Sequence, residues 1–332
     1  MDKIGIIGAG AWGTALAVLA QSAGRQVQIW AREPEVAEAI NSDKENTLFL
    51  SGVILPPEIQ ATTDLSEVVK VDALMLVVPS QYLRQICGAI APYLDPSIPV
   101  VICAKGVETG SGALMNEIVE CILPKNHYAV LSGPTFAAEV ARNEPAAVTL
   151  ACEDIGVGKK LTQALGTSRF RIYQSTDVIG AEIGGAVKNV IAIACGIVEG
   201  RSLGDSARAA IITRGLAEMA RLSRAKGGRP ETLMGLSGIG DLTLTCNAIQ
   251  SRNFSLGVAL GKGQRLDQVL ASRVSVAEGV DTAASIDALA ELLKVDAPIC
   301  SAVNSIANHG ADTESTISSL LARPVGLDSP FD

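Results

Sequence analysis

The chain has 332 residues, of which 48% are hydrophobic, so it can bury a large core and is long enough for two domains. Its 27 basic and 35 acidic residues give a net charge of −8, which provides no overall field to attract nucleic acid or an anionic membrane. Neither is expected as a partner. Seven scattered cysteines and only two histidines predict neither a disulfide framework nor a metal site.

The N-terminal residues, MDKIGIIGAGAWG, lack the basic and apolar regions of a signal peptide. The longest apolar segments are interrupted by charged residues and do not have the pattern of membrane spans. We therefore expect a cytoplasmic protein with reduced thiols.

Short β-branched runs alternate with helical patterns through the first half of the chain. The expected strands are residues 3–7, 26–30, 73–77, 99–104, 128–132, 146–151 and 170–173. This order predicts an α/β domain built on a parallel, doubly wound sheet. After about residue 177 strand-like runs nearly vanish, and the pattern predicts helices. We expect a first domain of residues 1–176 and an all-helical domain of residues 177–332.

A glycine-rich turn follows the first expected strand, with glycines at 8, 10 and 13, and a helical pattern follows the turn. Gly8 permits the tight turn, Gly10 lets the backbone approach a pyrophosphate, and Gly13 allows close packing of the helix on the strand. A bare G-x-G-x-x-G is weak evidence, because a structural turn has the same pattern. Its place between a strand and a helix favours dinucleotide binding in a Rossmann-type domain.

The second expected strand is followed by Arg32, where NAD-selective proteins usually carry a carboxylate. An arginine at this position pairs with the 2′-phosphate of NADP. Glu33 follows directly, and its carboxylate is the alternative contact, to a ribose hydroxyl. The sequence therefore favours NADP and leaves use of NAD open.

Polar groups also follow several later strands. Pro79-Ser80, Lys105-Gly106 and the segment SGPTF of residues 132–136 each lie just after an expected strand. Singly, each is an ordinary loop with a cap residue. Because the carboxyl ends of parallel strands meet at one edge of the sheet, together they predict a ligand-binding edge.

Lys188 lies near the centre of the apolar stretch GAEIGGAVKNVIAIACGIVEG, next to Asn189. A buried ammonium costs free energy unless it is paired, hydrated or deprotonated. A lysine that extends its head to solvent is one explanation. The other is proton transfer, because alcohol oxidation with a nicotinamide needs a base and ketone reduction needs an acid. Asp241 would then adjust the pKa of Lys188, and Gly184 and Gly185 would let a substrate or cofactor approach the helix.

A series of long motifs runs through nearly the whole chain: GAGAWGTALA, VPS, AKG, SGPTFAAEVA, GGAVKNVIAIACGIVEG, RAAIITRGLAEM, GLSGIGDLTLTC and SRN. In this series the chain closely resembles the bacterial-type NAD(P)-dependent glycerol-3-phosphate dehydrogenases. The resemblance implies reversible hydride transfer between sn-glycerol 3-phosphate and dihydroxyacetone phosphate, which supplies glycerol 3-phosphate for phospholipid synthesis. It also implies a homodimer whose helical domain binds substrate and dimerises.

The resemblance also implies which residues of this chain form the site. It makes Lys188 the residue that exchanges the proton, and we expect Asp241 and Asn189 to orient it. Together with the glycine turn, the expected cofactor contacts are Gly8, Gly10, Ala11, Trp12, Gly13, Arg32, Lys105, Ala137, Arg252, Val276 and Glu278. The expected substrate contacts are Lys105, Gly133, Thr135, Lys188, Asp241, Ser251, Arg252 and Asn253. No metal is expected.

Two positions depart from the commonest pattern of the family. Ala11 stands where many members have a serine that helps to hold the cofactor, so that side-chain contact is in doubt. Ser206 stands where an asparagine is frequent, and no role is assigned to it.

Two other functions fit parts of the chain. A β-hydroxyacid dehydrogenase of the 6-phosphogluconate dehydrogenase type also has a dinucleotide domain, a helical domain and a Lys-Asn pair. The motifs SGPTFA and GLSGIGDLTLTC favour the glycerol phosphate enzymes instead. A redox sensor that binds the nucleotide and signals through partners would not need the lysine, the aspartate and the Ser-Arg-Asn motif.

Overall fold

The computed structural model describes residues 1–271 and 278–324, which form two compact units. The first unit contains Met1–Ala104 and Met115–Val178. The second unit contains the residues from Ile179 onward together with Lys105–Leu114. We call the segment Lys105–Leu114 the arm. The sequence assigned it to the first domain, whereas in the structure it packs with the second unit.

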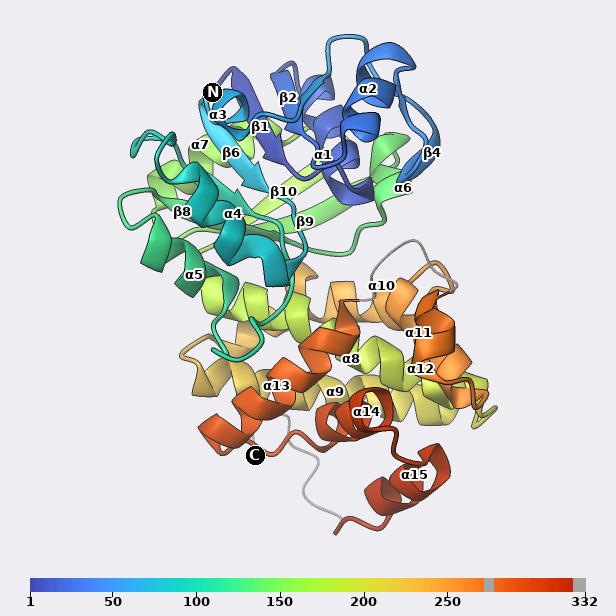
Figure 1. The fold of residues 1–332 in the computed structure, drawn as a ribbon. Coiled ribbons are helices and arrows are strands. Elements are labelled where there is room, and N and C mark those ends of the chain that lie inside the picture. The colour runs from blue at the N-terminus through green and yellow to red at the C-terminus, as the bar shows by residue number, and fades with distance from the viewer. Residues whose placement is uncertain (272–277, 325–332) are drawn as a thin grey trace. The chain divides into compact units, whose positions relative to one another are not determined.

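The centre of the first unit is a sheet that has eight strands among the described residues, in the order β10-β9-β8-β7-β6-β1-β2-β5 (Figure 1). All seven strands expected from the sequence are present. The strands are β1 (Lys3–Ile7), β2 (Gln26–Trp30), β5 (Gln60–Thr62), β6 (Ala73–Leu76), β7 (Val100–Ile102), β8 (Tyr128–Ser132), β9 (Ala146–Ala151) and β10 (Phe170–Ser175). Three strands were not expected: β5 and the pair β3 (Glu45–Asn46) and β4 (Leu50–Ile54), which forms a separate small sheet.

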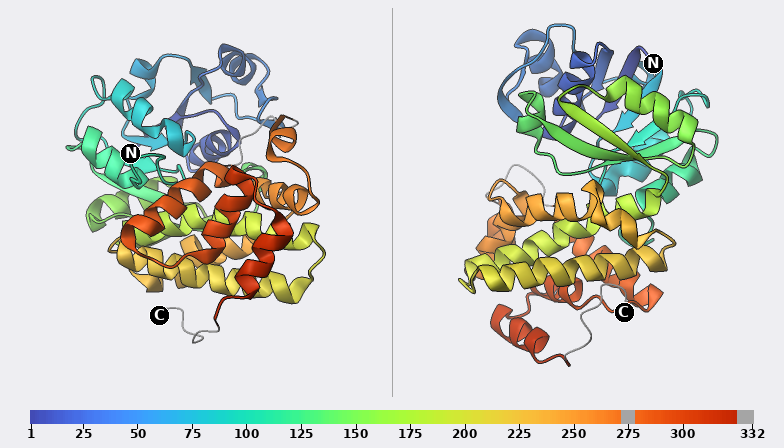
Figure 2. Two further views of the ribbon diagram at one scale, coloured as in Figure 1. Left: turned by 60° about the horizontal axis from the view of Figure 1, so that its bottom comes forward. Right: turned by 180° about the vertical axis from the view of Figure 1, so that it is seen from behind.

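Helices cover both faces of this sheet (Figures 1 and 2). One group packs around α1 and the other around α4, and β6 and β7 between them are completely buried. Central strands of this kind have continuous apolar sequences because both faces are covered. The helices are α1 (Ala11–Ser22), α2 (Pro34–Ser42), α3 (Leu65–Val68), η1 (Ser80–Tyr82), α4 (Leu83–Ile90), α5 (Met115–Ile122), α6 (Ala137–Ala141) and α7 (Ile155–Leu165).

The sheet is not parallel throughout, contrary to the expectation from the sequence. Strand β9 pairs antiparallel with β8, and β10 pairs parallel with β9. The helix between β8 and β9, α6, has 5 residues and so spans only about 8 Å. Strand β8 also has 5 residues and is about 17 Å long. The connection does not return to the opposite end of the sheet, so β9 starts where β8 ends and runs in the reverse direction.

The second unit is helical over its described residues, which confirms the expected fold class. Figure 2 shows the helices arranged around α8. Their bounds are α8 (Val178–Gly200), α9 (Asp205–Ala225), η2 (Pro230–Met234), η3 (Leu236–Gly240), α10 (Asp241–Asn247), α11 (Arg252–Gly261), α12 (Leu266–Ala271), α13 (Gly279–Leu293), α14 (Pro298–His309) and α15 (Thr313–Leu321).

Helix α8 forms the core of this unit. Among the described residues it alone combines the length and the hydropathy, 1.6 over its most apolar window, of a candidate membrane span. That window is 94% buried within the folded chain. Its apolar composition is therefore that of a helix surrounded by other helices.

Glycines bring α8 and α11 into backbone contact. A Cβ added at Gly196 of α8 would lie 2.1 Å from the carbonyl oxygen of Phe254, and one added at Gly257 of α11 would lie 2.1 Å from the carbonyl oxygen of Ile193. Neither position can accept a larger residue without movement of the helices. This close packing holds the first turn of α11 beside α8.

A buried carboxylate joins α9 to α14. Glu218 of α9 is 1% exposed, and its two carboxylate oxygens accept the backbone N–H groups of Ile299 at 2.7 Å and Cys300 at 3.1 Å. A negative charge is favourable at a helix N terminus. Burial nevertheless raises the pKa of Glu218 to about 7, although the two N–H groups oppose the shift.

Candidate active site

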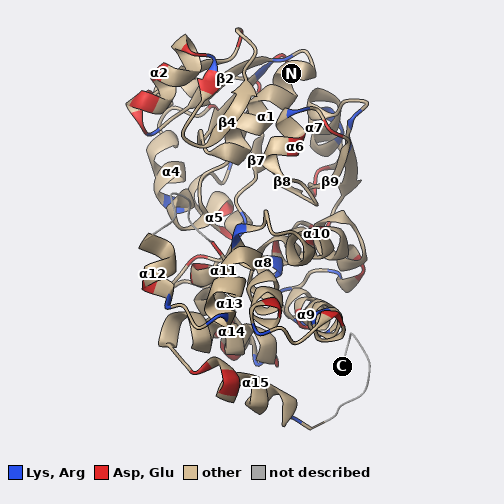
Figure 3. Ribbon diagram, turned by 90° about the vertical axis from the view of Figure 1, so that its right-hand side faces the viewer, with Lys and Arg blue, Asp and Glu red and all other residues tan. Residues whose placement is uncertain are grey.

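The charges of the chain do not single out one region as an anion-binding surface. Acidic residues are prominent on α2 and α15, and acidic and basic residues are otherwise mixed along the elements of both units (Figure 3). An anionic ligand must therefore be held by particular side chains and N–H groups. Two sets of such groups are present, one in each unit.

In the first unit, the glycine turn connects β1 to α1. Gly8 has a φ of +114°, and a Cβ there would lie 2.7 Å from the carbonyl oxygen of Val77. A Cβ at Gly13 would lie 1.8 Å from the carbonyl oxygen of Gly8, so the helix can approach the strand only with a glycine there. At Gly10, by contrast, no described atom lies within 4 Å of the added Cβ. The space beside Gly10 is open, and α1 begins there without a side-chain cap, which fits a pyrophosphate at the helix N terminus.

The other expected cofactor residues of this unit lie at strand and helix ends. Ala11 and Trp12 form the first turn of α1 and are partly buried. Arg32 follows β2, and its exposed guanidinium donates to a carboxylate oxygen of Glu33 from Nε at 2.8 Å and from Nη2 at 2.5 Å. An exposed ion pair of this kind contributes little free energy. A ligand phosphate can therefore compete for Arg32 at small cost.

The segment after β8 is shaped by packing. A Cβ at Gly133 would lie 2.8 Å from Cα of Val148 in β9, so the glycine allows the two strands to approach. Thr135 donates a long hydrogen bond of 3.5 Å to the carbonyl oxygen of Gly133, and Ala137 begins α6. These contacts account for the shape of the SGPTFA motif without a ligand.

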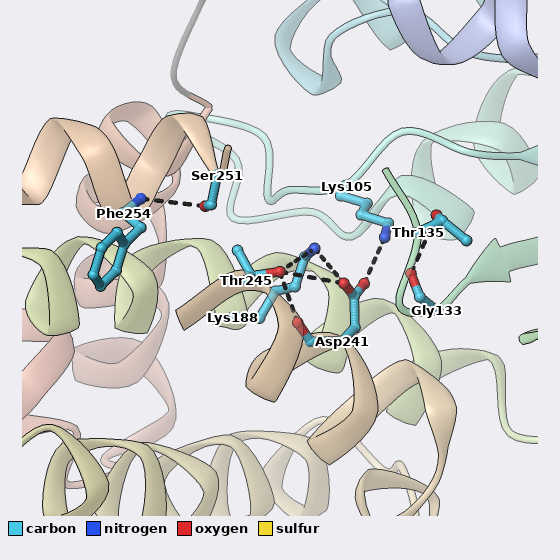
Figure 4. Close-up of polar contacts among 8 residues, drawn as sticks. All are labelled: Lys105, Gly133, Thr135, Lys188, Asp241, Thr245, Ser251 and Phe254. Atoms are coloured by element: carbon cyan, nitrogen blue, oxygen red, sulfur yellow. Dashed lines mark hydrogen bonds and ion pairs between the residues drawn. The ribbon is translucent and has the colours of Figure 1, made fainter. Parts of the chain in front are cut away.

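In the second unit, two lysines share one buried carboxylate (Figure 4). Lys188 of α8 places Nζ 2.5 Å from Oδ1 of Asp241, the first residue of α10. Lys105, the first residue of the arm, places Nζ 2.6 Å from Oδ2 of the same aspartate. Asp241 is completely buried and the Lys188 side chain is 9% exposed, so these charges are largely removed from water. The cluster carries two positive charges and one negative charge.

Thr245 completes the surroundings of Lys188 and was not identified from the sequence. Its hydroxyl donates to the carbonyl oxygen of Asp241 at 2.7 Å and accepts a hydrogen bond from Lys188 Nζ at 2.9 Å. Residues four apart on a helix lie on the same face. The spacing of Asp241 and Thr245 in the motif GLSGIGDLTLTC is the signal that would have identified it.

The environment lowers the pKa values of both Lys188 and Asp241, for different reasons. Burial lowers the pKa of Lys188 to about 8, the charge of Asp241 opposes that shift, and the charge of Lys105 adds to it. Burial alone would raise the pKa of Asp241, but the two lysine charges outweigh it and hold the pKa below its ordinary value. Near neutral pH the aspartate is ionised and Lys188 lies close to its titration range.

Glycines at 184 and 238 allow close backbone packing around η3, the segment just before Asp241. A Cβ at Gly184 of α8 would lie 2.2 Å from the carbonyl oxygen of Ser237 in η3. A Cβ at Gly238 would lie 2.1 Å from the carbonyl oxygen of Leu233. The expectation that Gly184 admits a substrate or cofactor is therefore wrong, because protein backbone occupies that side of the helix. The close contact brings Asp241 within reach of Lys188.

The Ser-Arg-Asn motif forms the start of α11. Ser251 is the N-cap, and its Oγ accepts the backbone N–H of Phe254 at 3.2 Å. Asn253 accepts the backbone N–H of Gly279 at 3.1 Å, which joins α11 to the start of α13. Ser251 and Asn253 are buried, whereas Arg252 between them is exposed. The hydrogen bonds thus orient the first turn of α11 and turn Arg252 outward.

The remaining expected residues lie around α13. Glu278 is partly buried; burial raises its pKa, and the charge of nearby Arg252 opposes the shift. The backbone carbonyl oxygen of Asn189 would be 2.9 Å from a Cβ at Gly279, so the helix carrying Lys188 also reaches this point. Val276 lies outside the described residues.

A dinucleotide-binding turn and a buried lysine with a lowered pKa are together the features of a nicotinamide-dependent dehydrogenase. Two protein-family models match the chain: the N-terminal part of NAD-dependent glycerol-3-phosphate dehydrogenase over residues 3–157 and the C-terminal part over residues 177–318. The chain therefore belongs to the family of NAD-dependent glycerol-3-phosphate dehydrogenases, and the resemblance seen in the sequence motifs is confirmed.

Individual relatives match over nearly their whole length. A glycerol-3-phosphate dehydrogenase (NAD(P)+) of Rhodospirillum rubrum is 57% identical over 329 residues, which cover 99% of this chain and 94% of the relative. The protein with the same name from Parvibaculum lavamentivorans is 54% identical over 322 residues, 97% of each chain. The crystal structure of glycerol-3-phosphate dehydrogenase from Coxiella burnetii superposes with a TM-score of 0.94 at 37% identity and covers 97% of this chain and 99% of that one.

Proposed function

We propose that this protein interconverts sn-glycerol 3-phosphate and dihydroxyacetone phosphate with NAD(P)(H), and that the cluster of Lys105, Asp241 and Lys188 is its catalytic centre. The observation that supports this most directly is the shared carboxylate, with both lysine Nζ atoms within 2.6 Å of Asp241. Such a group can hold a proton ready beside an oxygen atom of a bound substrate. A purely structural lysine would not need a second lysine on the same buried aspartate.

The proton chemistry follows from the environment of Lys188. When bound, the nicotinamide supplies the hydride for ketone reduction and accepts it in alcohol oxidation. In reduction, the Lys188 ammonium donates a proton to the ketone oxygen, and in oxidation the neutral amine takes the hydroxyl proton. The pKa of about 8 allows both forms to be populated near neutral pH. Asp241 and Thr245 direct the Nζ atom, and Asn189 is assigned to the same task.

The phosphate of the substrate needs cations and N–H donors. We assign these to Lys105, Arg252 and Asn253, with Ser251 contributing through the helix that it caps. The guanidinium of Arg252 offers two parallel donors that match two phosphate oxygens. Its exposure leaves it accessible to a ligand. Gly133 and Thr135 are assigned to the same substrate.

The cofactor is assigned to the glycine turn of the first unit. Gly8, Gly10, Ala11, Trp12 and Gly13 would hold the pyrophosphate region, and the open space beside Gly10 supports that fit. Lys105, Ala137, Arg252 and Glu278, together with Val276 outside the described residues, complete the assignment. We propose that NADP is preferred because Arg32 can pair with the 2′-phosphate.

The cellular setting is proposed from the family. Residues 1–176 are assigned mainly to the nucleotide, and residues 177–332 mainly to the substrate and to the homodimer contact. The enzyme acts in the cytoplasm and supplies glycerol 3-phosphate for phospholipid synthesis. It needs no nucleic acid, membrane or metal partner.

The first test is the initial rate of NADPH oxidation, and separately of NADH oxidation, with dihydroxyacetone phosphate. Unphosphorylated dihydroxyacetone is the control for recognition of the phosphate. Oxidation that depends on the phosphate supports the proposed substrate class. No oxidation with either cofactor would reject the proposed activity, and the nucleotide sensor and the β-hydroxyacid dehydrogenase would be tested next.

The second test is Lys188→Ala. Turnover should fall by about a hundredfold or more, the range for a lost general acid–base, while cofactor binding is retained. Lys262→Ala is the matched control, because this lysine is exposed at the C-terminal end of α11. Near-normal turnover in Lys188→Ala would remove it from the catalytic centre.

A further inference from the structure

The arm is a closed turn that packs into the core of the helical unit. Val107 and Leu114 form an antiparallel bridge, and both are completely buried among the helices of the second unit. Between them, the N–H of Glu108 donates to the carbonyl oxygen of Ala113 at 2.9 Å, and the N–H of Gly112 donates to that of Glu108 at 3.0 Å. The arm therefore has its own backbone hydrogen bonds and two apolar anchors.

A polar contact ties the tip of the arm to α13. The hydroxyls of Thr109 and Ser285 are 3.1 Å apart. Ser285 is buried and uses its own proton on the carbonyl oxygen of Asp281 at 3.1 Å. Since a hydroxyl has one proton, Thr109 is the donor in the bond between the two side chains. The tip of the arm is thus held in one orientation on α13.

These anchors act on Lys105 through a short length of chain. Lys105 is two residues before Val107, whose side chain is completely buried in the helical core. Its Nζ must then reach a carboxylate whose own position is set by α10. A charged hydrogen bond of 2.6 Å tolerates little displacement of either partner.

We propose that the arm is a positioning element for catalysis: its anchors, Val107, Leu114 and Thr109, hold Lys105 on Asp241 so that the helical unit itself assembles all three charged groups of the catalytic centre. This inference rests on the proposed function of Lys105 and Lys188. The three anchors touch neither the substrate nor the cofactor in this role, so they are positioning residues and not catalytic residues.

A positioning arm differs from a merely structural arm in its effect on the pKa of Lys188. The titratable and charged groups that face Lys188 are Asp241, Lys105, Cys246 and Glu278. Of these, only Lys105 belongs to the arm. Its positive charge lowers the pKa of Lys188, so movement of Lys105 away from the cluster would let that pKa rise.

The experiment measures KM for dihydroxyacetone phosphate and the pH dependence of kcat/KM for its reduction in Leu114→Ala and Thr109→Val. We expect KM to rise about tenfold in Leu114→Ala, the loss of about one charge-assisted hydrogen bond. The descending limb of the pH profile should move upward by about half a unit. Thr109→Val should change both quantities in the same direction by less, and Thr109→Ser, which keeps the hydroxyl, should match the wild type.

Two controls separate positioning from loss of stability. Leu222→Ala removes an equally buried leucine of the same core on α9, and it should lower stability without moving the limb. In a Lys105→Met background the arm variants should cause no further shift, because the charge that they displace is already absent. If Leu114→Ala fails to fold, Thr109→Val and Thr109→Ser decide.

The proposal is overturned if folded arm variants keep the wild-type KM and the wild-type position of the descending limb of the pH profile. It is also overturned if Leu222→Ala changes KM and the descending limb as Leu114→Ala does. The proposed function fails separately, if Lys188→Ala keeps its turnover. An inactive Lys188→Ala with arm variants that behave as wild type would reject only the role of the arm.

Discussion

Replacing Asp241 by asparagine would remove the negative charge that two lysines share and preserve the shape of the side chain. Lys188 Nζ and Lys105 Nζ lie 2.5 and 2.6 Å from its two oxygens. Two unit charges about 4 Å apart interact by roughly 4 kcal/mol at an effective dielectric constant of about 20, which corresponds to about three pKa units. The amide oxygen keeps part of this interaction. We therefore expect the pKa of Lys188, about 8 in the wild type, to fall by about one unit or more.

The assay is the pH dependence of kcat/KM for reduction of dihydroxyacetone phosphate, which reports the free enzyme. Reduction needs the protonated lysine, so the rate falls as pH rises through the pKa of Lys188. In Asp241→Asn this descending limb should move from about 8 to lower pH. Loss of a buried counter-charge should also destabilise the fold by about 3–5 kcal/mol, so rates are measured well below the unfolding midpoint.

Asp267→Asn is the control for this experiment, because the Asp267 side chain is 66% exposed. Its descending limb should stay at the wild-type position. A limb in Asp241→Asn that remains at about 8, or moves to higher pH, would refute the conclusion that Asp241 supports the protonated form of Lys188.

Three further predictions concern stability and cofactor choice. Gly196→Ala places a Cβ 2.1 Å from the carbonyl oxygen of Phe254 and should lower the free energy of unfolding, measured by chemical denaturation, by about 1–3 kcal/mol. In the control Gly88→Ala on α4, the added Cβ meets no described atom within 4 Å, and stability should be unchanged or higher. An equal loss of stability in the two variants would contradict the packing argument. Burial raises the pKa of Glu218 from 4.5 to about 7, so the folded state holds this proton more tightly than the unfolded state. As pH rises from 4.5 to 7, the free energy of unfolding of the wild type should therefore fall by about 3 kcal/mol relative to that of Glu218→Gln. A difference in unfolding free energy that is the same at pH 5 and pH 8 would exclude that titration. Arg32→Gln should lower the ratio of kcat/KM for NADPH to that for NADH by about tenfold, and an unchanged ratio would show that Arg32 does not bind the 2′-phosphate.

Much of the first unit could be predicted because its signals are local. The runs of β-branched residues predicted seven of the eight strands described in the main sheet, including fully buried β6 and β7. Strands β3, β4 and β5 were missed, because their sequences have no continuous apolar pattern and so give little local signal. The antiparallel direction of β9 was also missed, because strand propensity does not specify at which end of its neighbour a strand begins.

In the candidate site, too, features with a local sequence signal were predicted, and features that depend on tertiary contacts were missed. Lys188 attracted notice because an ammonium in an apolar stretch is costly, and that cost can be judged from neighbours in the sequence. Gly184 was assigned the wrong partner, because a glycine indicates a close approach but not which group approaches. Thr245 was missed, because its contact with Lys188 Nζ depends on how α10 packs beside α8.

The sequence by itself determined the alternation of strands and helices, the dinucleotide-type turn, the helical second half and the membership of the family. These features depend on residue spacing within a few turns of chain or on long linear motifs. Only the tertiary structure decided that Lys105 leaves the strand before it and joins the helical unit, where it shares Asp241 with Lys188. The physical reason is that this arrangement depends on burial of Val107 and Leu114 among helices that follow them by many residues in the chain. The sequence of the arm does not indicate which helices its apolar side chains will pack against.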